Sequence, residues 1–317
     1  MNEAQIGRGR AIHRDTGDTF YYATRLLPAR VRDEVYVLYG FFRIADEIVD
    51  GGHETDPAAQ RQRLEELRSA ALGERPAEEP VVEAFSELRR RHEIPATEVD
   101  AFVDAMLADI ETDRYATYDH LADYVRGSAA AVAHMLAAVF GTSDPEAARP
   151  HAAALGEALQ LTNFLRDVRE DYRTLGRVYL PDATLSEYGV TEADFERETA
   201  PPRLRGAVRR ELHRAEDRYR TGVAGIEYLA ADCQFPVLLA ATLYAEHHRL
   251  LREADFDVLG TDLSLSTPRK LMVVARTYWH WRRLGDPVAT FERASAVPAR
   301  SSDRGSTAGS RAVPHPE

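Results

Sequence analysis

The sequence predicts an all-α protein of one domain, and three observations support that prediction. Apolar residues recur at intervals of three and four along most of the chain, which is the period of one helix face. No segment shows the sustained alternation of β-branched and polar residues that is typical of a half-buried strand. Of the 317 residues, 44% are hydrophobic and 29% are charged, as in a globular chain with a large core.

Proline and glycine divide this helical pattern into elements. The first long helix should begin after Pro28 and end at Gly51. A polar break at about 176–199 follows the middle of the chain, and Pro202 suits the first turn of a long helix ending before Pro236. Further helices are predicted at 57–72, 80–92, 97–114, 118–140, 145–173, 236–253 and 267–284.

No domain linker is apparent before residue 286, so residues 1–285 are predicted to form one helical domain. From there on Ser, Arg, Ala, Gly and Pro dominate. Such a segment has too few large apolar side chains to offset the entropy cost of ordering it. Residues 286–317 are therefore predicted to be a disordered tail.

Composition excludes several classes of protein. The formal net charge of −12 argues against nucleic-acid binding, which needs clustered Lys and Arg. Cys233 is the single cysteine, so neither an internal disulfide nor a cysteine zinc site can form, and a reducing cytoplasm is expected. Residues 1–14 lack the apolar core of a secretory signal, and the longest uncharged stretch, 127–143, is too short to span a bilayer. Any membrane contact should be peripheral.

The first long helix carries a polar stripe. Tyr39, Arg43, Asp46 and Asp50 follow one another at steps of four, three and four residues. At 3.6 residues per turn, these steps place all four side chains on one face. This face therefore holds two acids, one base and one aromatic hydroxyl.

A second helix, predicted at 145–173, repeats the pattern. Its residues Gln160, Asn163, Asp167 and Asp171 follow at steps of three, four and four, with Arg166 beside them. Carboxylates four residues apart on a helix repel each other, by about 0.2–0.5 kcal/mol when exposed. Mg²⁺ takes one or two carboxylates and completes its shell with water and phosphate oxygens, and Arg binds phosphate through two N–H groups. Two such helices facing each other predict a magnesium–diphosphate site.

Each stripe also has a simpler explanation, because in a chain with 52 acidic residues most such pairs lie on a solvated helix face. The repetition of acids, arginine and uncharged hydrogen-bonding residues in two helices favours a functional site. Apolar neighbours could line a pocket for a hydrocarbon chain or serve only helix packing. These neighbours are Leu38, Phe41, Phe42, Leu161, Phe164 and Leu165.

The same segments resemble the squalene and phytoene synthases. Residues 19–28 read TFYYATRLLP and residues 38–50 read LYGFFRIADEIVD, which is similar to the opening signature of that family. Residues 156–171 read GEALQLTNFLRDVRED and 176–181 read GRVYLP, which resemble its most diagnostic stretch. The resemblance covers about residues 10–285.

The resemblance implies a helical bundle of the isoprenoid synthase type, with a central cavity and the two acidic stripes at its mouth. It implies that Mg²⁺, or Mn²⁺ in its place, is held by Asp46, Asp50, Asp167 and Asp171. It implies a catalytic role for Tyr39, Arg43 and Tyr244. It implies substrate binding by Thr19, Phe20, Arg43, Gln160, Asn163, Arg166, Arg177 and Tyr179.

The activity implied is the head-to-head joining of two allylic isoprenoid diphosphates through a cyclopropylcarbinyl diphosphate. The expected reaction is the conversion of geranylgeranyl diphosphate to phytoene for carotenoid synthesis, without a redox cofactor. A synthase that makes squalene, dehydrosqualene or presqualene diphosphate from farnesyl diphosphate would share every motif. Two further possibilities are a non-catalytic assembly factor on the same fold, which should have lost motif acids, and a helical scaffold with solvated acidic faces.

Three places differ from the family pattern or allow two interpretations. A phosphate-binding arginine of the family falls at Thr261, leaving Arg269 and Lys270 as candidate substitutes. A middle acidic segment of the family resembles Asp109, Asp113, Arg114 and Tyr115, but a solvated helix end is at least as good an interpretation. His134, within an alanine-rich stretch, is expected to be a core histidine rather than an acid or base.

Overall fold

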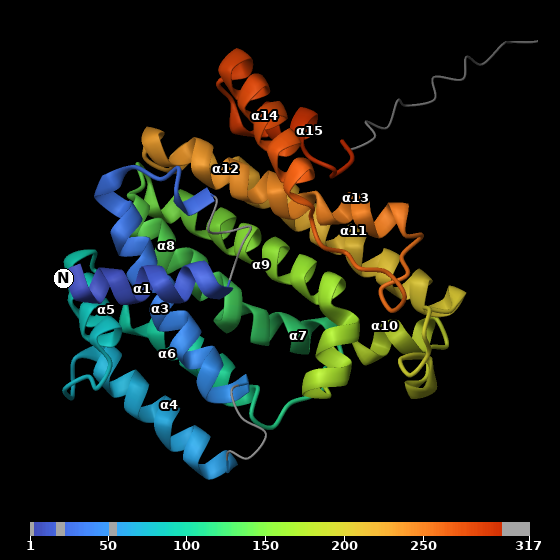
Figure 1. Cartoon of the computed structure of the whole chain (residues 1–317), viewed down its shortest axis with the longest axis horizontal. Coiled ribbons are helices and arrows are strands. Elements are labelled where there is room, and N and C mark those ends of the chain that lie inside the picture. The colour runs from blue at the N-terminus through green and yellow to red at the C-terminus, as the bar shows by residue number, and fades with distance from the viewer. Residues whose placement is uncertain (1–2, 17–22, 51–55, 300–317) are drawn as a thin grey trace, which may run out of the picture.

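The computed structural model describes residues 3–16, 23–50 and 56–299. Within these ranges the chain is built of helices, with two isolated β-bridges and no strand (Figure 1). The all-α prediction is confirmed. No helix in the described ranges is long and apolar enough to cross a bilayer.

The first half of the molecule surrounds α3, and the second half surrounds α9. The elements of the first half are α1 (Glu3–Thr16), α3 (Ala29–Asp50), α4 (Pro57–Leu72), α5 (Pro80–Arg91), α6 (Ala96–Ala108), α7 (Tyr118–Val125), the π-helical turn η1 (Arg126–Ala131) and α8 (Val132–Phe140). Those of the second half are α9 (Pro145–Glu170), the π-helical turn η2 (Asp171–Leu175), α10 (Asp182–Glu187), η3 (Glu192–Asp194), α11 (Pro202–Ala224), η4 (Gly225–Tyr228), α12 (Ala231–Ala245), α13 (His247–Glu253), α14 (Thr267–Leu284) and α15 (Pro287–Ala294).

The central helix is α9, which contacts η1 and α8 on one side and α11 and α12 on the other (Figure 1). One of these contacts brings two backbones together. A Cβ atom added at Gly156 would lie 2.6 Å from the carbonyl oxygen of Ala129 in η1. Only glycine permits this approach, so the α9–η1 crossing depends on Gly156.

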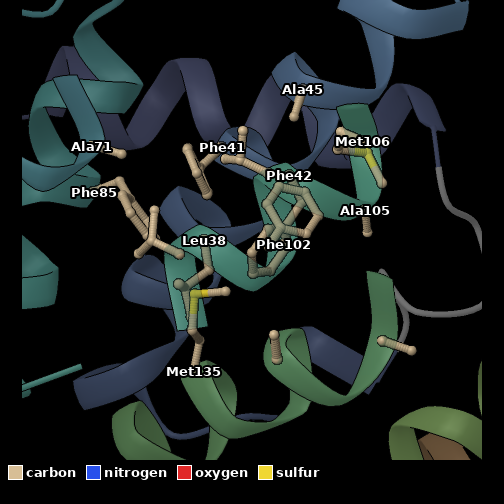
Figure 2. Close-up of a cluster of buried hydrophobic side chains, with 14 of the residues drawn as sticks. Leu38, Phe41, Phe42, Ala45, Ala71, Phe85, Phe102, Ala105, Met106 and Met135 are labelled. Atoms are coloured by element: carbon tan, nitrogen blue, oxygen red, sulfur yellow. The ribbon is translucent and has the colours of Figure 1, made fainter. Parts of the chain in front are cut away.

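The largest core cluster lies beneath the inner face of α3. Phe41 is fully buried and stacks on Phe85, with ring centroids 3.9 Å apart, and its ring centroid lies 5.6 Å from that of Phe102 (Figure 2). Met135 of α8 closes the cluster from the other side (Figure 2). These contacts fix the rotation of α3 about its axis and therefore the direction of its polar stripe.

Helix α6 ends six residues before the predicted end at 114, for a tertiary reason. The backbone N–H of Val178 donates to the carbonyl of Asp113 at 2.9 Å, and Arg177 Nη2 donates to the carbonyl of Asp109 at 2.8 Å. These contacts come from a segment nearly 70 residues away. The helical pattern of the sequence cannot reveal them.

The predicted boundary of the tail at 286 is corrected by α15. Asp286 caps this helix, because its side chain accepts from the backbone N–H of Ala289 at 2.6 Å. Phe291, Ala294 and Val297 are buried, so a few apolar residues at helical spacing suffice when α11, α12 and α14 lie against them. The prediction for residues 300–317 falls outside the described ranges.

We expect Phe41→Ala to lower the free energy of unfolding by about 3–5 kcal/mol, because truncation leaves a cavity among stacked rings that cannot close. Guanidinium unfolding followed by circular dichroism would measure this change. As a control, Leu26→Ala removes a side chain that is 49% exposed and should change stability by less than about 0.5 kcal/mol. Equal effects of the two substitutions would contradict this account of the core.

Candidate active site

A cavity of about 490 Å³ lies between α3 and α9 and is walled further by α6, α8 and α12. Its volume falls within the range of about 300–1,000 Å³ found for small-molecule pockets. Both polar stripes line it. The predicted site residues in its lining are Tyr39, Asp46, Asp50, Gln160, Asn163, Arg166, Asp167, Asp171, Arg177, Tyr179 and Tyr244.

On the α3 side, Asp46 faces the cavity with 38% of its side chain accessible. Burial of the carboxylate raises its pKa to about 7, although the charge of Arg43 acts in the opposite direction. Arg43 Nη1 lies 3.8 Å from Asp46 Oδ2, and Arg43 Nε lies 3.6 Å from Glu47. Among the predicted site residues that the structure describes, only Arg43 is not part of the cavity lining; it lies behind Asp46, which is.

On the α9 side, Arg166 forms a bidentate pair with Asp167, with N–O distances of 2.7 and 2.5 Å. Asp171 has no such pair; burial and the neighbouring charges of Asp167 and Glu170 raise its pKa to about 8. Asn163 lines the cavity, and its buried Oδ1 has no hydrogen-bond partner in the described chain. This stripe therefore combines a poorly compensated carboxylate with an unused acceptor.

Arg177 joins the two halves of the site. Its Nη1 lies 3.0 Å from Asp50 Oδ1 on α3, and its Nη2 donates to the Asp109 carbonyl at the end of α6. The residue is 8% exposed, so these contacts are made largely away from bulk water. Gly176, at φ 70°, reverses the chain after η2 and so brings Arg177 back toward the cavity.

Asp109 belongs to the site, whereas Asp113 lies on the solvated surface. Asp109 is 8% exposed and accepts a hydrogen bond from Tyr124 Oη at 2.7 Å. Burial raises its pKa to about 6, which the charge of Arg177 partly offsets. The interpretation of both acids as a solvated helix end is therefore wrong for Asp109 and correct for Asp113.

Aromatic rings form one wall beside the acids. Phe164 and Tyr179 stack with centroids 4.1 Å apart and an angle of 5° between their planes, and Tyr124 stacks on Tyr179 at 5.8 Å. Phe42 also lines the cavity. The other apolar neighbours singled out in the sequence, Leu38, Phe41, Leu161 and Leu165, are buried in the core instead.

Small side chains line the part of the cavity distant from the acids. Ala133 and Ala137 of α8 lie opposite Ala148 and Ala152 of α9. From Ala148 to Asp167 the lining follows α9 for 19 residues, which is about 28 Å at 1.5 Å per residue. The cavity thus has a charged end and a long apolar end. The alanine-rich sequences of α8 and α9 are the signal for this apolar end.

The remaining candidates are placed as follows. Tyr244 of α12 lines the cavity, where burial raises its pKa to about 12. Thr19 and Phe20 lie outside the described residues. Arg269 forms ion pairs with Glu246 and Glu253, and neither it nor Lys270 belongs to the cavity lining.

His134 contacts Glu98 and the Arg149 carbonyl, as expected for a structural histidine, and takes no part in the cavity lining. The described residues contain no group of three or more His, Cys, Asp or Glu side chains close enough to enclose a metal by themselves. They do present pairs of carboxylates, which is the protein share of a typical Mg²⁺ site that also uses phosphate oxygens. The donor set therefore fits a metal held jointly with a diphosphate.

Solved structures with the same arrangement of helices include two synthases. A dehydrosqualene synthase matches with a TM-score of 0.80 and 26% identity, over 89% of this chain and 98% of that one. A squalene synthase from Alicyclobacillus acidocaldarius matches with a TM-score of 0.70 and 25% identity, over 80% of this chain and 95% of that one. The fold is that of the isoprenoid synthases, as the resemblance implied.

Sequence comparison covers the same region. The squalene/phytoene synthase family profile matches residues 13–269. Phytoene synthase of Rhodobacter capsulatus is 31% identical over 277 residues, which cover 87% of this chain and 81% of that protein. Phytoene synthase of Arthrospira platensis is 31% identical over 276 residues, covering 83% and 89% of the two chains. The chain belongs to the squalene/phytoene synthase family and is a prenyltransferase.

Proposed function

We propose that this enzyme condenses two molecules of geranylgeranyl diphosphate to phytoene, using Mg²⁺. The observation that carries the proposal is that acidic stripes from two helices line the charged end of one cavity, whose other end is apolar. A diphosphate with a long hydrocarbon chain has the same division of polarity. A non-catalytic relative and a solvated scaffold are disfavoured, because all four stripe acids are present and line this cavity.

Similarity favours phytoene over the shorter products. Relatives at 30–32% identity are phytoene synthases, whereas the solved synthases at 25–26% identity are named for dehydrosqualene and squalene. The lining of about 28 Å along α9, from the apolar end at Ala148 to the charged end at Asp167, is compatible with a long chain. Synthesis of a shorter product from farnesyl diphosphate is the second candidate function, because the synthases of those products share the fold.

The residues that would hold Mg²⁺ are Asp46 and Asp50 on α3, Asp167 near the end of α9 and Asp171 at the start of η2. When bound there with a diphosphate, Mg²⁺ neutralises the carboxylates and the leaving group. The raised pKa values of Asp46 and Asp171 support this assignment, because burial and neighbouring carboxylates raise them and the nearby arginines do not offset the effect. A bound cation would supply positive charge there.

The arginines and amides would bind the two diphosphates. Arg166 and Arg177 line the cavity, and their guanidinium groups are oriented by Asp167 and Asp50 respectively. Phosphate oxygens could therefore accept hydrogen bonds from N–H groups that are already held in place. The unpartnered Oδ1 of Asn163 can accept from a protonated phosphate or a bound water. Positive charge fixed at the departing diphosphate favours its loss from the allylic carbon.

The reaction then proceeds in two halves. Loss of the first diphosphate leaves an allyl cation that alkylates the double bond of the second substrate, and a proton leaves to close a cyclopropane ring. Loss of the second diphosphate, rearrangement and loss of a second proton give phytoene. The stacked rings of Phe164, Tyr179 and Tyr124 exclude water from these cations and present π faces that tolerate positive charge.

Purified protein with Mg²⁺ and geranylgeranyl diphosphate is expected to form phytoene and inorganic diphosphate. Asp46→Asn or Asp167→Asn should lower the rate by at least about a hundredfold, because each removes a charged ligand from the site. Asp113→Asn removes an exposed acid near the end of α6; it is the matched control and should retain activity. Chromatography of the hydrocarbon products formed from geranylgeranyl diphosphate and from farnesyl diphosphate, in separate assays, would show which substrate chain length the enzyme uses. Product formed only from farnesyl diphosphate would support the second candidate function.

Thermal unfolding with ligands would test the joint binding of metal and diphosphate without measuring turnover. Because no three acids among the described residues enclose a metal, Mg²⁺ alone should raise Tm little, and so should inorganic diphosphate alone. Together, at about a hundred times their joint dissociation constant, they should stabilise the protein by about 2.7 kcal/mol, or several degrees in Tm. A full shift with Mg²⁺ alone would instead indicate a metal site made only of protein groups.

The Asp46→Asn variant should also be more stable than the unsubstituted protein at alkaline pH. A carboxyl whose pKa is raised by folding contributes stability that is present below its ordinary pKa and is lost as the pH rises through the folded value, here about 7. Since more than a third of the side chain is accessible, we expect a gain of about 1 kcal/mol at about pH 8 and about a third of that at about pH 5, where only part of the window between the ordinary and the folded pKa has been crossed. Thermal unfolding at both pH values measures it; a loss of stability at the higher pH would show that Asp46 is well compensated.

A further inference from the structure

Helix α14 packs against α12 and α15. Val273 and Thr277 are fully buried, and Val273 packs against Leu239 and Leu243 of α12. Arg276 of the same helix pairs with the buried carboxylate of Glu246, just beyond the end of α12, at 2.9 Å. Figure 1 shows α14 and α15 at one end of the molecule, next to α12. The opposite face of α14 is largely exposed in the described structure, although the Tyr278 ring meets that of Phe235 of α12 edge-on, with centroids 5.8 Å apart.

That opposite face is apolar. Leu271, Met272, Tyr278 and Trp279 are 64%, 49%, 53% and 49% exposed, and their spacing of one, six and one residues places them on one side of the helix. All the large apolar side chains exposed in the described ranges, except Leu26, belong to α14 or α15. An apolar patch concentrated in one place usually marks an interaction surface.

The same helix is basic within an acidic protein. It contains five Lys or Arg residues and no Asp or Glu, whereas the chain as a whole has a net charge of −12. Arg282 and Arg283 are exposed and follow the apolar stripe, and the Arg283 guanidinium lies 3.6 Å from the centroid of the Trp279 ring. Burial, together with the charges of Arg293, Arg276 and Arg283, lowers the pKa of His280. The exposed Arg282 and Arg283 thus place positive charge beside the apolar stripe.

We propose that the exposed face of α14 docks on the surface of a bilayer that contains anionic lipid. Trp and Tyr are favoured at the boundary between headgroups and acyl chains, because one end of each ring is apolar and the other is polar. Leu271 and Met272 would enter the acyl region beside them. Arg282 and Arg283 would reach lipid phosphates at the end of the stripe, as in amphipathic helices that lie in the plane of a membrane.

A second copy of the chain fits this face less well. In a two-fold dimer the same surface meets itself, and α14 carries no acid that could pair with the exposed arginines of the other copy. A stable interface also needs about 800 Å² from each partner, contributed by about 20–30 residues. The exposed stripe of one helix is smaller than that. An anionic bilayer offers acyl chains to the apolar side chains of α14 and phosphate groups to its exposed arginines.

The location gives such docking a purpose, if the proposed function holds. Helix α12 has one face in the cavity, with Pro236, Ala240 and Tyr244, and packs with another against α14. Only α14 itself and α12 thus lie between the membrane-facing surface and the space where an insoluble hydrocarbon would form. Docking there would bring the cavity wall close to the bilayer that must take up the product.

Cosedimentation of the full-length protein with lipid vesicles tests the proposal without substrate. We expect binding to vesicles of phosphatidylcholine mixed with phosphatidylglycerol, much weaker binding to phosphatidylcholine alone, and release at high salt. Arg282→Ala with Arg283→Ala should weaken binding by about fivefold for each arginine removed. Leu271→Ser with Trp279→Ser should abolish it, since their side chains supply the buried apolar area.

The matched control is Arg63→Ala with Arg90→Ala, which removes two exposed arginines from α4 and α5 and should leave binding unchanged. All these positions are exposed, so circular dichroism should show folded proteins throughout. Failure of the unsubstituted protein to bind anionic vesicles, or equal binding by the α14 variants, would overturn the proposal. So would a dimer, seen by sedimentation velocity, that the α14 substitutions convert to a monomer. Because no substrate is present, these outcomes are independent of which diphosphate the enzyme uses.

Discussion

Carboxylates from two helices share one confined cavity, and the rest of the structure depends on keeping them there. Burial raises the pKa of Asp46, Asp171 and Asp109. Such an arrangement costs folding free energy, because each acid would ionise more easily in water. The protein supplies only partial compensation, through Arg43 beside Asp46, Arg166 beside Asp167, and Arg177 beside Asp50 and Asp109. Sites that are poorly compensated in this way are typical of function rather than of stability.

The core explains how the protein tolerates that cost. The stacking of Phe41 on Phe85 fixes one side of α3, so its opposite side must face the cavity. On α9, the close approach of Gly156 to the Ala129 carbonyl does the same for the second stripe. Both helices are thus oriented by apolar or backbone contacts that are independent of the charges. The acids can then remain at the cavity even though their mutual repulsion would turn them toward solvent.

Sequence reasoning succeeds where the information is local. The stripes on α3 and α9 follow from steps of three and four residues, and the bounds of α3, α4 and α14 follow from proline and glycine signals. Sequence reasoning fails where contacts between segments far apart in the chain determine the structure. Asp109 enters the site only because Tyr124 and Arg177 contact it, and α6 ends early because Val178 pairs with Asp113. Helix α15 escapes prediction because its apolar residues are few and gain stability only against the helices that receive them.

Helix α12 connects the features that lie outside the motifs. Its cavity face carries Tyr244. Two residues later lies Glu246, a fully buried carboxylate that forms ion pairs with Arg249, Arg269 and Arg276. A buried charge of this kind is costly unless several partners satisfy it, so loss of α14 would leave it poorly compensated. The contact between α14 and α12 is therefore fixed by charge as well as by packing. Consequently, α14 keeps its apolar side turned outward. A partner bound on that side would be linked through α14 to α12, which forms part of the cavity wall.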